Sequence, residues 1–216
     1  MWKRERRDMI RIKPGEHVFV AGRTGSGKTF LVKKYLQHVA PVYCLDVKKT
    51  LYWPGVPEKD IVYLDKFLDV IKSKAKKVVY QPRWQELTFD CYNLFFEYIY
   101  NKEEVVLWID ETMGIGTAIK YPEYYKALLT RGRELGISVW SCTQRPASIP
   151  LISMSEATHF FAFDLNLKKD RERIAEISGQ EQFLRLPGKY VFWYYHVTDS
   201  TAPVRARLTQ AKKEGV

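Results

Sequence analysis

Short runs of apolar residues alternate with amphipathic stretches along most of this chain. The apolar runs predict strands at residues 17–21, 42–45, 61–64, 78–80, 105–109, 137–141, 159–163 and 190–195. Helical spacing predicts helices at residues 29–38, 67–73, 89–101 and 121–135, the last ending before Gly136, and a charged helix start at residues 167–173. This alternation predicts an α/β fold, a mainly parallel central sheet with helices on both faces and ligands at the carboxyl ends of the strands.

Length and composition are consistent with one domain. The 216 residues are 46% hydrophobic, which is enough for a buried core and argues against disorder. We expect a basic arm at residues 1–13, a single domain at residues 14–203 and a basic tail at residues 204–216. No apolar run approaches the roughly 20 residues that span a membrane, and no signal-peptide core follows the basic start. The sequence therefore predicts a soluble intracellular protein without a transmembrane segment.

Charge and cysteine content narrow the class of protein. Lys and Arg number 35 against 25 Asp and Glu, a net charge of +10 that suits a polyanionic partner such as nucleic acid. A generic basic surface would give the same count. Cys44, Cys91 and Cys142 lie far apart among apolar neighbours. That pattern is typical of reduced buried thiols, and not of a disulfide framework or a zinc site.

A complete phosphate-binding loop follows the first predicted strand. It consists of Gly22, Arg23, Thr24, Gly25, Ser26, Gly27, Lys28 and Thr29. The three glycines let the backbone turn so that successive N–H groups point at phosphate oxygens. Lys28 would place its charge on the β- and γ-phosphates, and the hydroxyl of Thr29 would ligate Mg²⁺. ATP with Mg²⁺ is the ligand that this loop predicts.

An acidic pair follows the most hydrophobic predicted strand, at residues 105–109. Asp110 stands where a magnesium-bound carboxylate is expected, and Glu111 is placed to activate an attacking water. A strand that simply ends in solvated acids would look the same. The phosphate loop upstream favours the catalytic interpretation, and because small-molecule kinases usually lack the adjacent glutamate, it favours hydrolysis.

Residues 128–146 read LLTRGRELGISVWSCTQRP. This stretch resembles the FtsK/HerA superfamily of ring-shaped DNA-translocating ATPases, in which an arginine-bearing helix ends in glycine and the next strand closes on Thr-Gln-Arg-Pro. Two further motifs are similar: Asp-Val-Lys at residues 46–48, where the family has Asp-Pro-Lys, and Leu-Pro-Gly-Lys-Tyr at residues 186–190. The resemblance covers residues 14–196.

The resemblance implies a RecA-like P-loop NTPase core in a homo-oligomeric ring, a hexamer or a pentamer, with double-stranded DNA through its centre. Gln144 would sense the γ-phosphate. Arg133 matches the family's arginine finger, which reaches the ATP of the neighbouring subunit, and Arg131 is the second candidate. Without the resemblance, both arginines would be taken as solvated charges on a helix.

The chain carries none of the membrane spans or accessory modules of the larger members. It therefore resembles the genome-packaging ATPases of membrane-containing icosahedral viruses. The expected function is to package double-stranded DNA into a preformed capsid, in the host cytoplasm or in association with the virion. A cellular or plasmid FtsK/HerA-type translocase or helicase is one alternative. An ATP-dependent DNA-binding switch with little turnover is another.

Candidate DNA contacts are less sharply defined. The glycine-bearing loop 114–120 ends in Lys120 and is the first candidate, and Arg83 with Trp84 is the second. Either can equally be an ordinary surface loop. The basic termini suit DNA, an acidic capsid or portal-vertex protein, or plain solvation.

Overall fold

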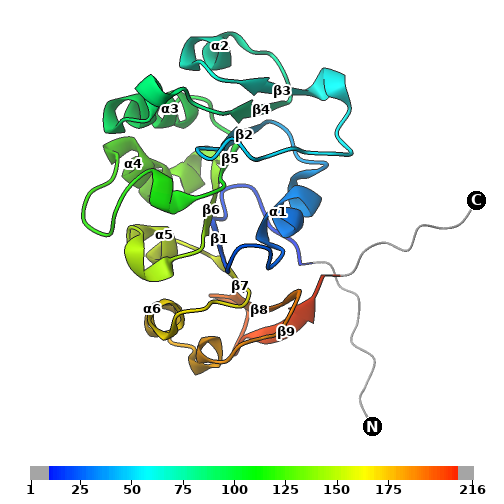
Figure 1. The fold of residues 1–216 in the computed structure, drawn as a ribbon, viewed down its shortest axis with the longest axis vertical. Coiled ribbons are helices and arrows are strands. Elements are labelled where there is room, and N and C mark those ends of the chain that lie inside the picture. The colour runs from blue at the N-terminus through cyan, green and yellow to red at the C-terminus, as the bar shows by residue number, and fades with distance from the viewer. Residues whose placement is uncertain (1–9, 209–216) are drawn as a thin grey trace, which may run out of the picture.

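The computed structural model of this chain describes residues 10–208, which contain a nine-stranded sheet in the order β3-β4-β2-β5-β6-β1-β7-β8-β9 (Figure 1). The strands are β1 (Val18–Ala21), β2 (Val42–Leu45), β3 (Ile61–Leu64), β4 (Lys77–Tyr80), β5 (Val106–Ile109), β6 (Ser138–Thr143), β7 (His159–Ala162), β8 (Val191–His196) and β9 (Val204–Arg207). Strands β1 to β7 pair in parallel, whereas β8 and β9 pair antiparallel at one edge. The expected mainly parallel sheet is confirmed.

Helices cover both faces of the sheet, as predicted. They are α1 (Lys28–Leu36), α2 (Phe67–Lys72), α3 (Phe89–Tyr100), α4 (Glu123–Arg131), α5 (Ile152–Ser155) and α6 (Lys168–Ser178). Figure 1 shows α1 on one face, with the segment that follows β2, and the other five helices on the opposite face. Within residues 10–208, none of these helices combines the length and the apolar character that crossing a membrane requires.

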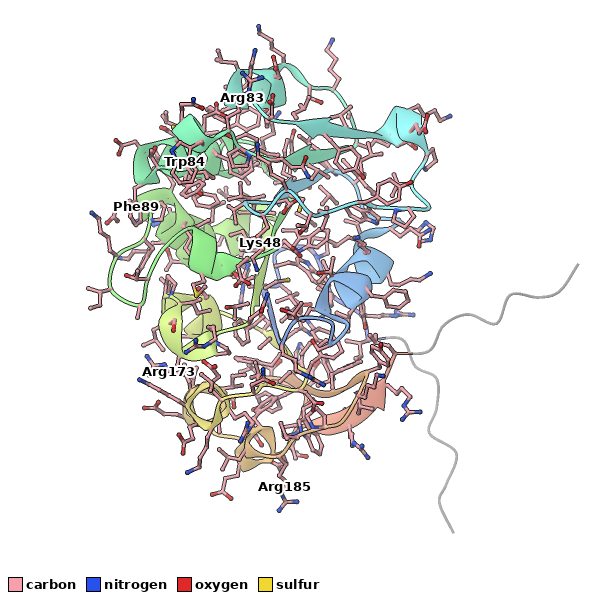
Figure 2. The ribbon with its side chains drawn as sticks, in the orientation of Figure 1. Lys48, Arg83, Trp84, Phe89, Arg173 and Arg185 are labelled. Carbon is pink, nitrogen blue, oxygen red and sulfur yellow. The ribbon has the colours of Figure 1, made fainter. Side chains whose placement is uncertain are left out.

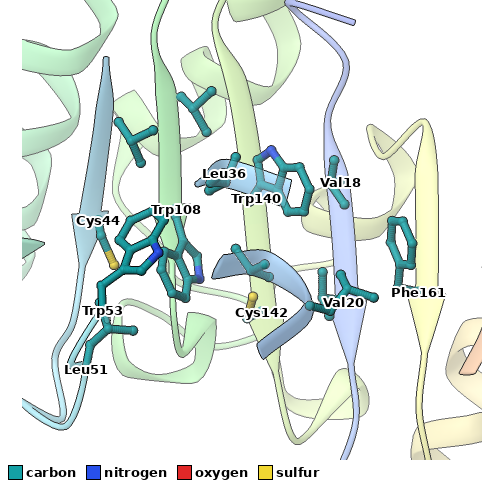
Figure 3. Packing of buried hydrophobic residues seen from close by; sticks show 14 of the residues in the cluster. Val18, Val20, Leu36, Cys44, Leu51, Trp53, Trp108, Trp140, Cys142 and Phe161 are labelled. Atoms are coloured by element: carbon teal, nitrogen blue, oxygen red, sulfur yellow. The ribbon is translucent and has the colours of Figure 1, made fainter. Parts of the chain in front are cut away.

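Three tryptophans are part of the core on the α1 face of the sheet. Trp108 of β5 and Trp140 of β6 are buried on neighbouring strands, and Val18 and Val20 of β1 lie on the other side of β6 from Trp108 (Figure 3). Trp53 meets Trp108 edge-on, with ring centres 5.4 Å apart and planes at 88°. Edge-to-face contacts of this kind stabilise a core beyond the area that they bury. The role of Trp108 in packing, expected from its place in an apolar strand, is therefore confirmed.

Two predictions about the ends of the chain need correction. Residues 204–207, expected to begin a tail, form β9, and its alternating basic side chains gave no apolar signal because this edge strand is largely solvent-exposed. Ile10 and Ile12 of the expected basic arm pack against the core on the α1 face. The remaining parts of both segments, residues 1–9 and 209–216, lie outside the described residues.

Two further predictions were wrong in detail. Cys91 is only partly buried, because it lies towards the outer side of α3, while Cys44 and Cys142 are buried and all three are free thiols. Burial raises the pKa of both buried thiols, which keeps them protonated.

The predicted helix at 121–135 is α4 followed by a 3₁₀ turn at Gly132–Leu135, and it ends at Gly136 with φ 70°.

His17 joins three elements to the start of β1. Its ring is 1% exposed; Nδ1 accepts the Val139 N–H at 3.1 Å, and Nε2 donates to the Leu129 carbonyl at 3.0 Å. Its carbonyl oxygen accepts the backbone N–H groups of Thr158 and His159. Because Nδ1 accepts a hydrogen bond, the ring must be neutral, with its proton on Nε2. Burial, with a smaller effect from Arg133, lowers the pKa of His17 to about 4.

This burial predicts acid sensitivity. The pKa of His17 rises from about 4 in the folded chain to about 6.5 on unfolding. Its contribution to stability is therefore complete above pH 6.5 and is lost as the pH falls toward 4. Between pH 7.5 and 5, the free energy of unfolding should fall by about 2 kcal/mol through this group. Denaturant unfolding of His17→Gln across this range should show a correspondingly flatter dependence. His38→Gln, at an exposed histidine, should keep the wild-type slope; an equal slope in His17→Gln would contradict this assignment.

Candidate active site

Three neighbouring strands bring the predicted site to one edge of the sheet. In the order β5-β6-β1, Ile109 is level with Ser141, and Ala21 is level with Thr143. The phosphate loop after β1, the acidic pair after β5 and Gln144 after β6 therefore start within two residues of one another along the strand direction. A backbone bond from Gly22 N–H to the Thr143 carbonyl, 3.1 Å, ties the loop to β6.

The phosphate loop has the geometry of an anion cradle. Gly25 and Gly27 have φ of 72° and 112°, in the left-handed region that favours glycine. In residues 10–208, the backbone N–H groups of Gly25, Gly27, Lys28 and Thr29 have no protein partner. These free donors lie at the start of α1, where the helix dipole adds positive potential. The loop therefore fits the phosphates that the sequence predicted.

Lys28 lies inside the loop. Its side chain is largely buried, and Nζ donates to the carbonyls of Gly22 at 2.6 Å and Arg23 at 3.2 Å. Burial lowers the pKa of Lys28, while the nearby carboxylates of Glu111 and Asp110 raise it. The Ser26 hydroxyl is buried without a partner in the described chain. Phosphate oxygens would supply partners to both side chains, which strengthens the fit.

A magnesium ion would fit between Thr29 and Asp110. The Thr29 hydroxyl donates to Asp110 Oδ1 at 3.2 Å. Adjacent ligand oxygens of an octahedral Mg²⁺ with bonds of 2.0–2.1 Å lie about 2.9 Å apart. Burial, and then the negative charge of Asp46, raise the pKa of Asp110. Asp46 is fully buried, and its Oδ1 has no partner among the described residues. A divalent cation would offset this concentration of negative charge.

Glu111 is held at the same edge by three groups. Its side chain is 4% exposed; Oε2 pairs with Lys48 Nζ at 2.8 Å, and Oε1 accepts from the Thr143 hydroxyl at 3.2 Å. The backbone N–H of Gln144 adds a longer contact to Oε1, 3.4 Å. Figure 2 shows Lys48 in the middle of the molecule, yet its side chain is 43% exposed. A partly exposed lysine can release the carboxylate that it holds.

Gln144 connects the phosphate loop with Glu111. Its side-chain Oε1 accepts from the Thr24 hydroxyl at 2.8 Å, while its backbone faces Glu111. The turn that carries it is fixed by Asp170 of α6, 1% exposed, which accepts from Arg145 Nε and Ala147 N, both at 3.0 Å. Because β6 lies between β1 and β5, Gln144 is placed to contact both halves of the site.

The two candidate arginines lie away from this edge. Arg131 ends α4 and Arg133 is in the following turn, both before β6 begins, whereas the site lies after β6 ends. A strand of this length spans about 20 Å, so neither side chain can reach the phosphate loop of its own chain. Both are exposed. Arg133 donates to Thr158 Oγ1 at 3.0 Å; Arg131 has no hydrogen-bond or ion-pair partner within the described chain.

The candidate DNA contacts meet near the start of α3. Lys120 Nζ lies 5.0 Å from the ring centre of Phe89, the first residue of α3. Arg83 and Trp84 precede that helix, and Figure 2 shows Trp84 between Phe89 and Arg83 along one edge of the molecule. Arg83 is paired with Asp65 at 2.6 Å, and Trp84 is 83% exposed. The structure thus brings Lys120 against the helix that follows Arg83 and Trp84 in the chain.

Sequence reasoning gave no role to Lys48, Asp46 or Thr143. Lys48 and Asp46 follow β2, and β2 pairs with β5, so their proximity to the acidic pair depends on strand order. The only sequence signal was the charged Asp-Val-Lys step directly after a predicted strand. Thr143 was quoted within a motif, but its bond to Glu111 could not be anticipated without the register of β6.

The order of the parallel strands and the phosphate loop after β1 together give the fold of P-loop NTPases. Its known structural neighbours include the genome packaging NTPase B204 from Sulfolobus turreted icosahedral virus 2 in complex with sulfate, with a TM-score of 0.73, 21% identity, and coverage of 92% of this chain and 99% of B204. The same protein with AMPPCP gives a TM-score of 0.68 at 22% identity, over 91% and 99% of the two chains. The pCW3 conjugation coupling protein TcpA gives 0.62 at 15% identity, over 92% of this chain and 62% of TcpA.

At such identities the likeness establishes the fold alone, and the expected fold of P-loop NTPases is thereby confirmed. No protein-family model matches the chain, and a search of curated proteins finds no similar sequence.

The loop geometry predicts unequal effects of alanine at two glycines. A Cβ on Gly27 would lie 2.6 Å from Leu208 Cδ1 and 3.3 Å from Phe163, at a φ of 112°. A Cβ on Gly25, φ 72°, would meet nothing within 4 Å. Gly25→Ala should cost only the left-handed backbone, about 1 kcal/mol. Gly27→Ala should cost about 2–4 kcal/mol through added crowding. Denaturant unfolding without nucleotide measures both, and equal losses would contradict the packing seen around Gly27.

Proposed function

We propose that this chain is an ATP-hydrolysing ring motor that translocates double-stranded DNA, and that it packages a viral genome into a preformed capsid. The observation that carries the proposal is the arrangement of Glu111. It lies buried beside the phosphate loop and is linked to that loop through Gln144, with Thr143 as its second contact. A site for nucleotide binding alone would not need a carboxylate in this position.

In the proposed reaction, Lys28 and the free N–H groups of the loop bind the β- and γ-phosphates. Thr29 and Asp110 would hold Mg²⁺, which would further neutralise phosphate charge. Water attacks the γ-phosphorus while Glu111 accepts its proton, and ADP leaves with the electron pair of the broken P–O bond. Oε2 of Glu111 is paired with Lys48 in this structure. Release of that ion pair is therefore part of activation.

The proposed ring would bring an arginine to the ATP from outside the chain. Neither Arg131 nor Arg133 can reach the site of its own chain, so an arginine finger would come from a neighbour in a hexamer or pentamer. An arginine finger contributes about 10³–10⁵ in kcat to reactions of this class. Because Arg133 is engaged by Thr158, the exposed Arg131 is the freer of the two. DNA in the channel would meet Lys120 and Arg83 through its phosphates.

Packaging is favoured over other DNA motors by the similarity to B204, a genome packaging NTPase of comparable length. The net charge of +10 suits DNA as the cargo. The motor would then work in the host cytoplasm, or associated with the virion, against a capsid or portal-vertex protein. An ATP-dependent switch with little turnover would show itself in the first measurement below. Capsid genes beside the gene for this chain would favour packaging, and a nuclease gene would favour a cellular translocase.

Steady-state ATPase activity with and without double-stranded DNA tests the motor. Wild type should hydrolyse ATP faster with DNA, and Glu111→Gln should lose about 10²-fold or more of the rate, because it removes the general base, while still binding ATP. Glu103→Gln, at an exposed acid, is the matched control and should behave as wild type. Slow turnover that DNA leaves unchanged would favour the switch. Activity indifferent to both DNA and Glu111 would refute the motor.

Mixing inactive subunits tests the arginine finger. Arg131→Ala or Arg133→Ala, whichever abolishes hydrolysis, should regain activity when mixed with Glu111→Gln. In such rings, some interfaces combine an intact Glu111 with an intact arginine from the neighbour. Hydrolysis that depends on the mixing ratio is the expected result. If both arginine variants keep wild-type activity, or if no mixture recovers any, the finger assignment is wrong.

A further inference from the structure

A second hollow opens beside the phosphate loop. The loop itself borders a hollow of about 210 Å³, formed by residues 25–30. The neighbouring hollow has a volume of about 620 Å³ and is lined by Gly27, Phe30, Lys189, Tyr190, Arg207 and Leu208. Gly27 and Phe30 belong to both walls, so a ligand anchored in the first hollow reaches the second. A volume of 620 Å³ falls within the range of about 300–1,000 Å³ that is usual for small-molecule sites.

The turn that carries Tyr190 is fixed to the phosphate loop by one residue. The Asp164 carbonyl accepts the Arg23 N–H at 2.8 Å, and its side-chain Oδ1 accepts the Gly188 N–H at 2.9 Å. Tyr190 itself has φ 57°, and its carbonyl accepts the Leu208 N–H at 3.1 Å. A left-handed tyrosine held by its neighbours is the kind of strained residue that occurs at ligand sites.

Two aromatic rings in this hollow are partly exposed to solvent. Phe30 is 38% exposed and Tyr190 is 49% exposed. Lys189 Nζ lies 5.3 Å from the ring centre of Tyr190 and brings positive charge to the same wall. Exposed rings of this kind bind bases by stacking, because every base presents a π-face.

The charged side chains in the wall of this hollow can donate hydrogen bonds but cannot accept them. Among the described residues that line it, the charged side chains are Lys189 and Arg207, which only donate hydrogen bonds, and none carries a carboxylate or an amide. Adenine and guanine differ at the edge, where one presents an amino group and the other a carbonyl. Strong discrimination requires buried groups that pair with one edge and are left unpaired by the other. This wall offers stacking and exposed cations instead.

We propose that this hollow binds the purine base and ribose of a nucleoside triphosphate between Phe30 and Tyr190, and that it holds the base by stacking without selecting adenine over guanine. The inference rests on the proposed function, since it takes the phosphate loop as the anchor of the same nucleotide. It extends that function from ATP to purine nucleoside triphosphates in general.

Calorimetric titration with ATP, GTP and inorganic tripolyphosphate, each with Mg²⁺, tests the proposal. Wild type should bind ATP and GTP with affinities within about 10-fold of each other, as expected when no polar group reads the base edge. Phe30→Ala and Tyr190→Ala should each weaken ATP and GTP about 10-fold, the size of one lost base–ring stack. Tripolyphosphate, which has no base, should bind all variants equally.

Two further variants separate stacking from structure. Tyr190→Phe keeps the ring and should retain wild-type affinity for both nucleotides. Tyr52→Ala removes an exposed tyrosine outside the hollow and should change nothing. Equal losses for tripolyphosphate and ATP, unchanged nucleotide affinity in both alanine variants, or a preference for either ATP or GTP above about 10-fold, which would indicate that a polar group reads the base edge, would overturn the proposal.

Different experimental outcomes would refute the proposed base site and the proposed motor. If wild type binds nucleotide as described but does not hydrolyse it, the motor proposal falls while the base site stands. If wild type hydrolyses ATP and the alanine variants bind it normally, the base site falls while the motor stands. If wild type binds neither ATP nor tripolyphosphate, the phosphate loop is not a nucleotide site, and both are refuted.

Discussion

The parallel register of β5, β6 and β1 is the constraint on which the site depends. Carboxyl ends of parallel strands meet at one edge, and here they end at nearly the same height. A slip of one residue would turn every side chain of a strand to the opposite face, so the hydrophobic packing on both faces also fixes the chemistry at the edge. Gln144, on the middle strand, is the residue that this order places between the phosphate loop and Glu111.

The same edge collects charges that a protein interior does not usually tolerate. Lys28, Asp46 and Glu111 are each less than a tenth exposed. Each is held by its neighbours: Lys28 by loop carbonyls, Asp46 by Gln81 and the chain at Leu51, and Glu111 by Lys48. Buried ions are retained when such partners satisfy them, and removal of one partner is costly. The site is thus preorganised by pairs that nucleotide and Mg²⁺ would replace with interactions of their own.

The sequence predicted the class of fold, eight of the nine strands, and both halves of the site, because each has a strong local signal. The phosphate loop is contiguous, and Asp110 and Glu111 directly follow an apolar strand. What it could not predict depends on strand order or on edges. Lys48 reaches Glu111 only because β2 pairs with β5. The sequence pattern did not predict β9, because a largely exposed edge strand lacks an apolar run. The functional roles of Arg131 and Arg133, like those of Lys120 and Arg83, depend on neighbours and ligands and remain proposals.

The distribution of tryptophan gives the protein two separate optical reporters within residues 10–208. Trp53, Trp108 and Trp140 are almost fully buried, and Trp108 is two residues from Asp110, whereas Trp84 is 83% exposed beside Arg83. Buried indoles emit at shorter wavelengths and are shielded from a dissolved quencher, while an exposed indole is quenched readily. Emission that survives quenching therefore reports mainly on the core of the α1 face, which includes the strand that carries the acidic pair. Among residues 10–208, the quenchable part comes from Trp84 and, to a smaller extent, from the half-buried Trp193 of β8. One unlabelled sample can therefore follow the core and the surface at once.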